Sequence, residues 1–151
     1  MNTSNTAQVL FSIVLVCNCL WFGATFWYFS FKSTSATKIL TPRSERENTL
    51  FSTVAWSVKF LGGMNVAFSL FSALVLLSQS LFPEPKQHFI FALVFAVAHG
   101  SQFAFNVPLA QLERKGRILF WNVLSGPMLG IFIIDATLMI ANLVAALLFL
   151  L

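Results

Sequence analysis

The sequence predicts an all-α membrane protein, a bundle of four transmembrane helices. Three observations predict it: 58% of the 151 residues are hydrophobic, only 9% are charged, and the apolar residues fall into four long runs. Soluble domains carry about 25% charged residues, so this chain has too little polar surface to cover a globule in water. The composition excludes a soluble enzyme, a nucleic-acid-binding domain and a disordered tail.

Each apolar run is long enough to cross a bilayer, since a helix needs about 20 residues to span the hydrocarbon core. Four crossings leave no room for a separate soluble domain, so we expect one domain over residues 1–151. The predicted spans cover about residues 9–31, 50–77, 89–112 and 127–150, and the loops between them include residues 32–49 and 113–117.

The fourth apolar run, residues 118–151, is too long for a single crossing, because its 34 residues would make a helix of about 51 Å. The pair Gly126-Pro127 divides it, and proline is favoured in the first turn of a helix. We therefore expect the fourth span to start near Pro127 and residues 118–125 to form a short amphipathic helix along the membrane interface. The alternative is one tilted helix that is kinked at the proline.

The basic residues indicate the orientation. Seven of them lie in loops 32–49 and 113–117, whereas the loop between the second and third spans holds only Lys86. Lys and Arg accumulate on the cytoplasmic side of membrane proteins. We therefore expect both loops in the cytoplasm and both termini outside it, in a bacterial inner membrane or the endoplasmic reticulum.

Three ionisable residues lie inside the spans, where such groups are costly and usually face the bundle interior. They are Lys59, His99 and Asp135. Lys59 lies about 13 Å from the cytoplasmic end of its span and Asp135 about 12 Å, if the fourth span begins at Pro127. Equal depth would allow an ion pair between them, a hypothesis that fails if the fourth span begins at residue 118.

The third span carries a polar stripe. His99, Gln102 and Asn106 follow a spacing of i, i+3 and i+7, which places them on one helical face. With Asn18 and Asn65 at similar depth, they predict a polar seam through the bundle. Two interpretations are open: a ligand site or proton relay, or hydrogen bonds that only hold the helices together.

Small residues indicate helix packing. Gly62 and Gly63 lie in the second span, and Gly126 and Gly130 have the GxxxG spacing at the start of the fourth. Such residues let helix backbones approach closely. They can pack within the chain or against another subunit.

The outline resembles the small four-helix membrane proteins of the DoxX-like and ergosterol-pathway scaffold type. The resemblance lies in the length, the outward termini, the long first loop, the second-span segment VKFLGGMNVAF and the His-bearing third-span segment AVAHGSQFAFNVP. It implies that such a protein holds partner enzymes together in the membrane or has an accessory role. It transfers no catalytic residue to this chain.

These observations favour a non-catalytic accessory or scaffold subunit that binds a lipid or other apolar ligand within the bundle. Its expected partners are membrane lipids and either another membrane protein or further copies of the chain. The alternative is an oligomeric transporter or proton channel that uses Lys59, Asp135 and His99. A small lipid enzyme with His99 as acid or base is a third reading. The signatures GxSxG, HExxH and the P-loop are absent, and we predict no metal, cofactor or catalytic residue.

Overall fold

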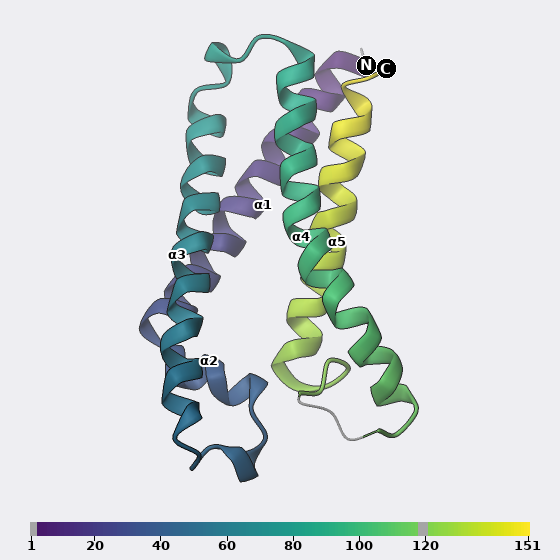
Figure 1. Ribbon diagram of the computed structural model, residues 1–151. Coiled ribbons are helices and arrows are strands. Elements are labelled where there is room, and N and C mark those ends of the chain that lie inside the picture. The colour runs from purple at the N-terminus through teal and green to yellow at the C-terminus, as the bar shows by residue number, and fades with distance from the viewer. Residues whose placement is uncertain (1–2, 118–120) are drawn as a thin grey trace.

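A computed structural model describes residues 3–117 and 121–151, and within these ranges the chain is helical with no strand (Figure 1). Five α-helices and two short 3-10 helices follow one another in the described residues. Their bounds are α1 Thr3–Phe31, α2 Ser33–Leu40, η1 Arg43–Glu45, α3 Leu50–Leu77, η2 Gln79–Leu81, α4 Pro85–Arg114 and α5 Gly126–Leu148.

Four of these helices, α1, α3, α4 and α5, are long and apolar enough to cross a membrane. The shortest of them, α5, has 23 residues and is therefore about 34 Å long, more than the thickness of a hydrocarbon core. The predicted all-helical architecture with four apolar spans is confirmed at this level.

The starts of α4 and α5 have clear local causes. Glu84 and Gln87 form a capping box, in which each side chain accepts a hydrogen bond from the other residue's backbone N–H, and Pro85 fills the first turn. Gly126 has a φ of +61°, a conformation that glycine adopts without strain, and Pro127 follows it in the first turn of α5.

The interfacial helix expected over residues 118–125 is not seen where the chain is described. Residues 118–120 lie outside the described residues, and residues 121–125 form bends rather than a helix. The Glu113 carboxylate accepts hydrogen bonds from the backbone N–H groups of Val123 and Leu124, at 2.7 and 2.8 Å. These bonds satisfy the backbone groups without a helix.

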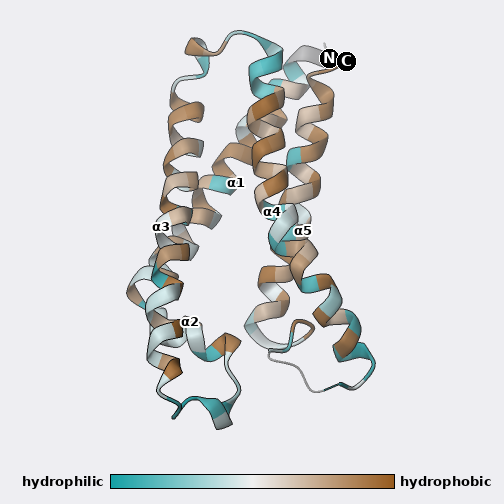
Figure 2. Ribbon diagram, in the orientation of Figure 1, coloured by the Kyte–Doolittle hydropathy of each residue, from teal (hydrophilic) through white to brown (hydrophobic). Residues whose placement is uncertain are grey.

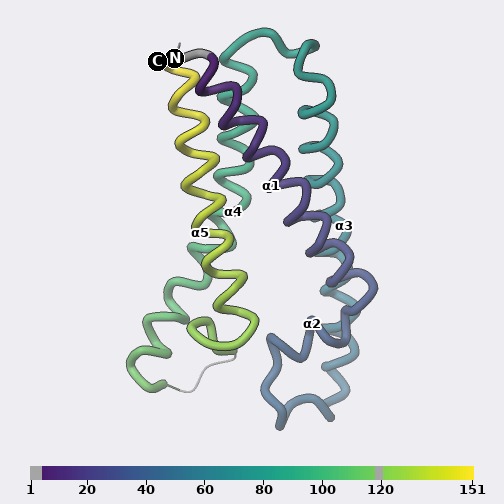
Figure 3. Tube along the Cα trace, turned by 180° about the vertical axis from the view of Figure 1, so that it is seen from behind, coloured from purple at the N-terminus to yellow at the C-terminus, as the bar shows by residue number. Residues whose placement is uncertain are grey.

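The helices form two pairs. α1 packs along α3, α4 packs along α5, and contacts between α1 and α5 join the pairs. Figures 1 and 3 show the two termini side by side at one end, and the pairs separating toward the other end. That far end carries the two connections rich in Lys and Arg, and Figure 2 shows its hydrophilic residues.

The core lies toward the end that holds the termini. It is built largely from aromatic rings, including Phe11, Phe22 and Phe95, with alanines of α4 and α5 where the backbones come close. The Phe22 ring lies 5.1 Å from that of Phe68 and 6.2 Å from that of Phe95, measured between centroids. Aromatic contacts of this length stabilise a packed core.

Helix α2 is a difference from the sequence prediction, which treated residues 32–49 as a loop. α2 packs on α3 and buries Ser33, Ala36 and Thr37. An eight-residue helix is marginal by itself in water, so this contact with α3 is what stabilises it.

Candidate functional site

A buried polar contact joins α4 to α5. His99 Nδ1 lies 2.9 Å from Asp135 Oδ1, and the two side chains are 0% and 1% exposed. Trp21 of α1 donates a hydrogen bond from Nε1 to the same oxygen at 3.3 Å. The His99 ring also stacks on Phe22, with 4.7 Å between centroids. Three helices therefore meet at this pair.

The second ring nitrogen of His99 leads into a pair of amides. His99 Nε2 lies 3.1 Å from Asn18 Oδ1. Asn18 and Asn142 exchange two hydrogen bonds of 2.9 and 3.1 Å, and both are fully buried. We call the five side chains Trp21, Asn18, His99, Asp135 and Asn142 the buried network.

A backbone carbonyl determines the protonation of His99. The Leu138 oxygen can only accept, so the Asn142 nitrogen must be the atom that faces it, at 2.8 Å. Asn142 Oδ1 then accepts from the Asn18 nitrogen, which leaves Asn18 Oδ1 facing His99. Because this oxygen can only accept, His99 carries a proton on Nε2.

One further proton lies between His99 and Asp135. A hydrogen bond between Nδ1 and Oδ1 needs one proton on either atom, which makes the pair an imidazolium–carboxylate or a neutral imidazole–carboxylic acid. The net charge of the pair is zero in both cases, which is what burial in hydrocarbon favours. The other oxygen, Asp135 Oδ2, is buried without a hydrogen-bond partner in the described part of the chain.

The predicted ion pair between Lys59 and Asp135 is wrong. The Lys59 ammonium lies 3.7 Å from the centroid of the Trp56 ring, in a cation–π contact on α3 itself. Within the described ranges, the only acid–base contact within 4 Å is that of His99 with Asp135. Lys59 and Asp135 lie at similar depth, but on helices that belong to different pairs. α3, which carries Lys59, packs along α1, whereas α5, which carries Asp135, packs along α4.

The stripe His99, Gln102 and Asn106 splits into three environments. His99 belongs to the buried network. Asn106 accepts a hydrogen bond from Trp121 Nε1 at 3.1 Å and donates to the Gln102 backbone oxygen at 2.9 Å. The Gln102 side chain is exposed and lines a cavity between α3 and α4. No single polar seam passes through all three.

This cavity, which we call the α3–α4 cavity, has a volume of about 370 Å³. Asn65 and Gln102 bring carboxamides to it from facing helices, and its lining is otherwise mostly apolar. Asn65 is only 7% exposed, yet its side chain makes no hydrogen bond to the described residues. The full lining is Phe29, Leu61, Met64, Asn65, Phe68, Ala98, Ser101 and Gln102.

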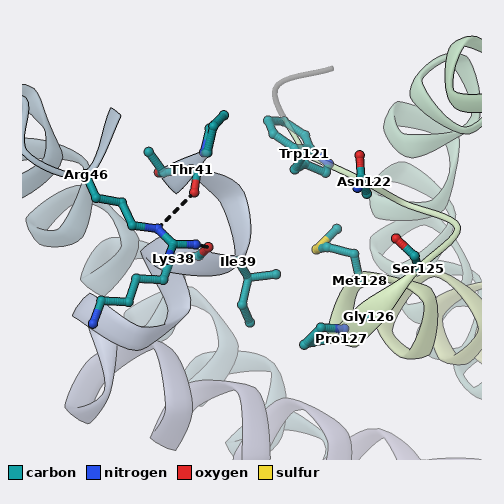
Figure 4. Close-up of a pocket in the computed structure, with 11 residues that line it drawn as sticks. Lys38, Ile39, Thr41, Arg46, Trp121, Asn122, Ser125, Gly126, Pro127 and Met128 are labelled. Carbon is teal, nitrogen blue, oxygen red and sulfur yellow. Dashed lines mark hydrogen bonds between the residues drawn. The ribbon is translucent and has the colours of Figure 1, made fainter. Parts of the chain in front are cut away.

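A second cavity, of about 440 Å³, lies where the helix pairs separate, between the end of α2 and the start of α5 (Figure 4). Arg46 borders it, but the guanidinium donates to the backbone oxygens of Lys38 and Thr41, at 2.7 and 3.2 Å. Arg46 therefore holds the loop to α2. Trp121 and Ser125 lie on the opposite wall.

The glycines chosen for helix packing also differ in their surroundings. A Cβ on Gly62 would meet the Ser30 hydroxyl and lie 3.0 Å from the Ser30 backbone nitrogen, so α1 and α3 touch here. Added Cβ atoms on Gly63, Gly126 and Gly130 would meet nothing within 4 Å. A role for these three against another subunit stays a prediction. A Cβ added to Gly100 would lie 3.1 Å from the sulfur of Met139 on α5, so α4 and α5 approach closely here. This contact was not predicted from the sequence.

Two members of the buried network, Trp21 and Asn142, were not chosen from the sequence. Asn18 was expected in the polar seam with His99, which it contacts. A usable signal existed for Trp21, which is three residues from Asn18 and so shares its helical face.

Within the described residues, no three His, Cys, Asp or Glu side chains come together as a metal site. No protein-family model, curated protein or solved structure matches the chain. The resemblance to the DoxX-like group therefore stays an expectation.

Proposed function

We propose that this chain is a non-catalytic multi-pass membrane protein that holds a lipid or other apolar ligand in the α3–α4 cavity and acts as an accessory or scaffold subunit. The observation that carries the proposal is the Asn65 carboxamide, which lines the cavity on a residue only 7% exposed and makes no hydrogen bond to the described residues. An amide without a partner costs several kcal/mol in hydrocarbon. A ligand with a polar group at this depth would remove that cost.

The composition of the cavity supports the choice of ligand. Ligand sites are typically about 300–1,000 Å³, mostly apolar, with a few placed polar groups, and the α3–α4 cavity has this character. No charged side chain lines it. A neutral polar group on an apolar body fits such a site better than an ion does.

The buried network supports the non-catalytic part of the proposal. His99 and Asp135 face each other and do not line the α3–α4 cavity, so a ligand held there would not touch these titratable side chains. They join α1, α4 and α5 while the cavity between α3 and α4 stays available.

We place the protein in a bacterial inner membrane or the endoplasmic reticulum, with both termini on the non-cytoplasmic side. The positive-inside rule supports this orientation, since seven basic residues lie at one end of the four spans and Lys86 alone at the other. Other copies or another membrane protein are proposed partners.

One observation favours the alternative, a proton-linked transporter. His99 Nδ1 and Asp135 Oδ1 share one proton, and Asp135 Oδ2 has no partner among the described residues. Intramembrane carboxylates and histidines of this kind serve proton relays in pumps and transporters. The structure separates Lys59 from this pair, so a relay would need His99 and Asp135 without Lys59.

Native mass spectrometry of the purified chain in mild detergent tests the proposal. We expect a co-purifying neutral lipid whose occupancy falls at least fivefold in Asn65→Leu and in Gln102→Leu. The matched control is Gln111→Leu, an exposed glutamine of α4 outside the cavity, which should keep the wild-type occupancy. Equal occupancy in all four proteins would contradict the proposal.

A further inference from the structure

A third cavity, of about 360 Å³, lies between the start of α2 and the first turns of α3. Its polar groups are the ammonium of Lys59 and the hydroxyls of Ser33, Thr34 and Ser52, and the indole of Trp56 forms part of its wall. This cavity is distinct from the α3–α4 cavity, with which it shares no residue.

Lys59 brings a positive charge that the described residues do not neutralise. It is half-buried on a helix that can span the membrane, and no carboxylate lies within 4 Å of it in the described ranges. Its contact with Trp56 attracts the cation, but the ammonium makes no hydrogen bond to the described residues. A buried or half-buried lysine in a membrane normally reaches an anion or the headgroup region.

Ser33 gives an independent indication. It is 8% exposed and lines the cavity, and its hydroxyl makes no hydrogen bond to the described residues. Ser33 is also the first residue of α2, whose N-cap Lys32 provides no side-chain cap. The positive end of the helix dipole and a free hydroxyl therefore face the same cavity as the ammonium, an arrangement that favours an anion.

We infer that this cavity binds the phosphoryl group of an anionic phospholipid, with Lys59 and Ser33 as the main contacts. The surface beside it fits the rest of such a lipid, because Trp56 and Phe60 of α3 are 67% and 78% exposed and offer an apolar path for an acyl chain. The same phosphoryl chemistry is found in free phosphate, which lacks that apolar contact.

Calorimetric titration of the detergent-solubilised chain with three probes tests the inference. The probes are dihexanoyl-phosphatidylglycerol, uncharged dihexanoylglycerol and inorganic phosphate. We expect the phosphatidylglycerol to bind at least tenfold more tightly than either of the others. Binding of phosphate as tight as that of the lipid would assign the site to the free anion, whereas equal binding of the uncharged lipid would overturn the inference.

Amino-acid substitutions test which residues bind the phosphatidylglycerol. Lys59→Met should weaken it at least tenfold, which is about 1.4 kcal/mol, and Ser33→Ala should weaken it about threefold, within the range for one hydrogen bond. Lys59→Arg should stay within threefold of wild type, since it keeps the charge. Lys38→Met is the matched control, because Lys38 lies on α2 but outside this cavity, and it should change affinity less than twofold.

The inference fails if Lys59→Met binds like the wild type, or if Lys38→Met weakens binding as much as Lys59→Met does. Should Lys59→Met not fold, the comparison of Ser33→Ala with Lys38→Met decides in its place. These results are independent of the neutral-lipid occupancy that tests the α3–α4 cavity, because the two sets of variants do not overlap.

Discussion

His99 and Asp135 form the one acid–base contact within 4 Å in the described parts of the chain, with 2.9 Å between Nδ1 and Oδ1 and both side chains sealed from solvent. Trp21, Asn18 and Asn142 surround this contact, so α1, α4 and α5 are joined through it. We therefore expect substitutions in the buried network to lower the free energy of unfolding more than substitutions elsewhere in the molecule.

Asp135→Asn should lower the free energy of unfolding. His99 Nδ1 and the Trp21 N–H face the same Asp135 oxygen. An amide atom there can either donate to an unprotonated Nδ1 or accept from Trp21, so one of the two contacts is lost. We expect a loss above about 1.7 kcal/mol, the largest value measured for interhelical hydrogen bonds in a membrane protein, and toward about 3 kcal/mol, as for a broken buried ion pair. Unfolding in mixed micelles measures it.

Thr137→Val is the control for this measurement. Thr137 is an exposed residue of α5 whose hydroxyl bonds only to the Ile133 carbonyl of its own helix. Its replacement should change stability by less than about 0.5 kcal/mol. If Asp135→Asn has as small an effect as the control, the buried network does not hold the helices.

Double-mutant cycles distinguish the two possible partners of Asp135. Residues that do not touch have additive effects, within about 0.5 kcal/mol, whereas residues in contact show coupling of about 0.5–3 kcal/mol. We therefore expect additivity for Lys59→Met with Asp135→Asn, and coupling above 1 kcal/mol, on this scale, for His99→Leu with Asp135→Asn. The reverse result would mean that Lys59 is the true partner.

Gly62→Ala and Gly63→Ala should have opposite effects on stability. The new methyl at Gly62 meets the Ser30 backbone nitrogen at 3.0 Å, so α1 must shift, and overpacking of this kind costs about 1–3 kcal/mol. At Gly63 the methyl meets open space, and alanine is favoured over glycine in helices by about 1 kcal/mol. Thermal unfolding of both variants checks the order, and equal melting temperatures would exclude the tight contact of α1 with α3.

Vesicles that contain the wild-type protein should take up protons no faster than protein-free vesicles under a potassium-diffusion potential. The physical reason is that His99 and Asp135 are 0% and 1% exposed, so the proton that they share has no described path to either side. Uptake that the protein accelerates and that His99→Leu abolishes would support the transporter alternative and count against the accessory role.

Much of the helical architecture follows from the apolar runs, because lipid requires every backbone group to be satisfied inside a helix. α3 begins and ends at Leu50 and Leu77, where its apolar run does. α2 was not predictable in the same way. Its segment, STSATKIL, has little helix preference, and its stability comes from packing on α3.

The site was harder to predict than the spans. Rise per residue gives the depth of Lys59, His99 and Asp135, but depth does not say which helices are neighbours or how each is rotated. The choice between Lys59 and His99 as the partner of Asp135 depends on that packing. The Asn65 amide and the α3–α4 cavity likewise exist only because α3 and α4 remain apart.

Photocrosslinking tests the central claim, a neutral lipid in the α3–α4 cavity, most directly. The protein would be illuminated with a monoacylglycerol that carries a diazirine on its chain, and the labelled peptides would be sequenced by mass spectrometry. We predict labels concentrated at residues 61–68 of α3 and 98–102 of α4, and their loss in Asn65→Leu. Labels spread evenly over the outer faces of all four long helices, unchanged in Asn65→Leu, would contradict the claim.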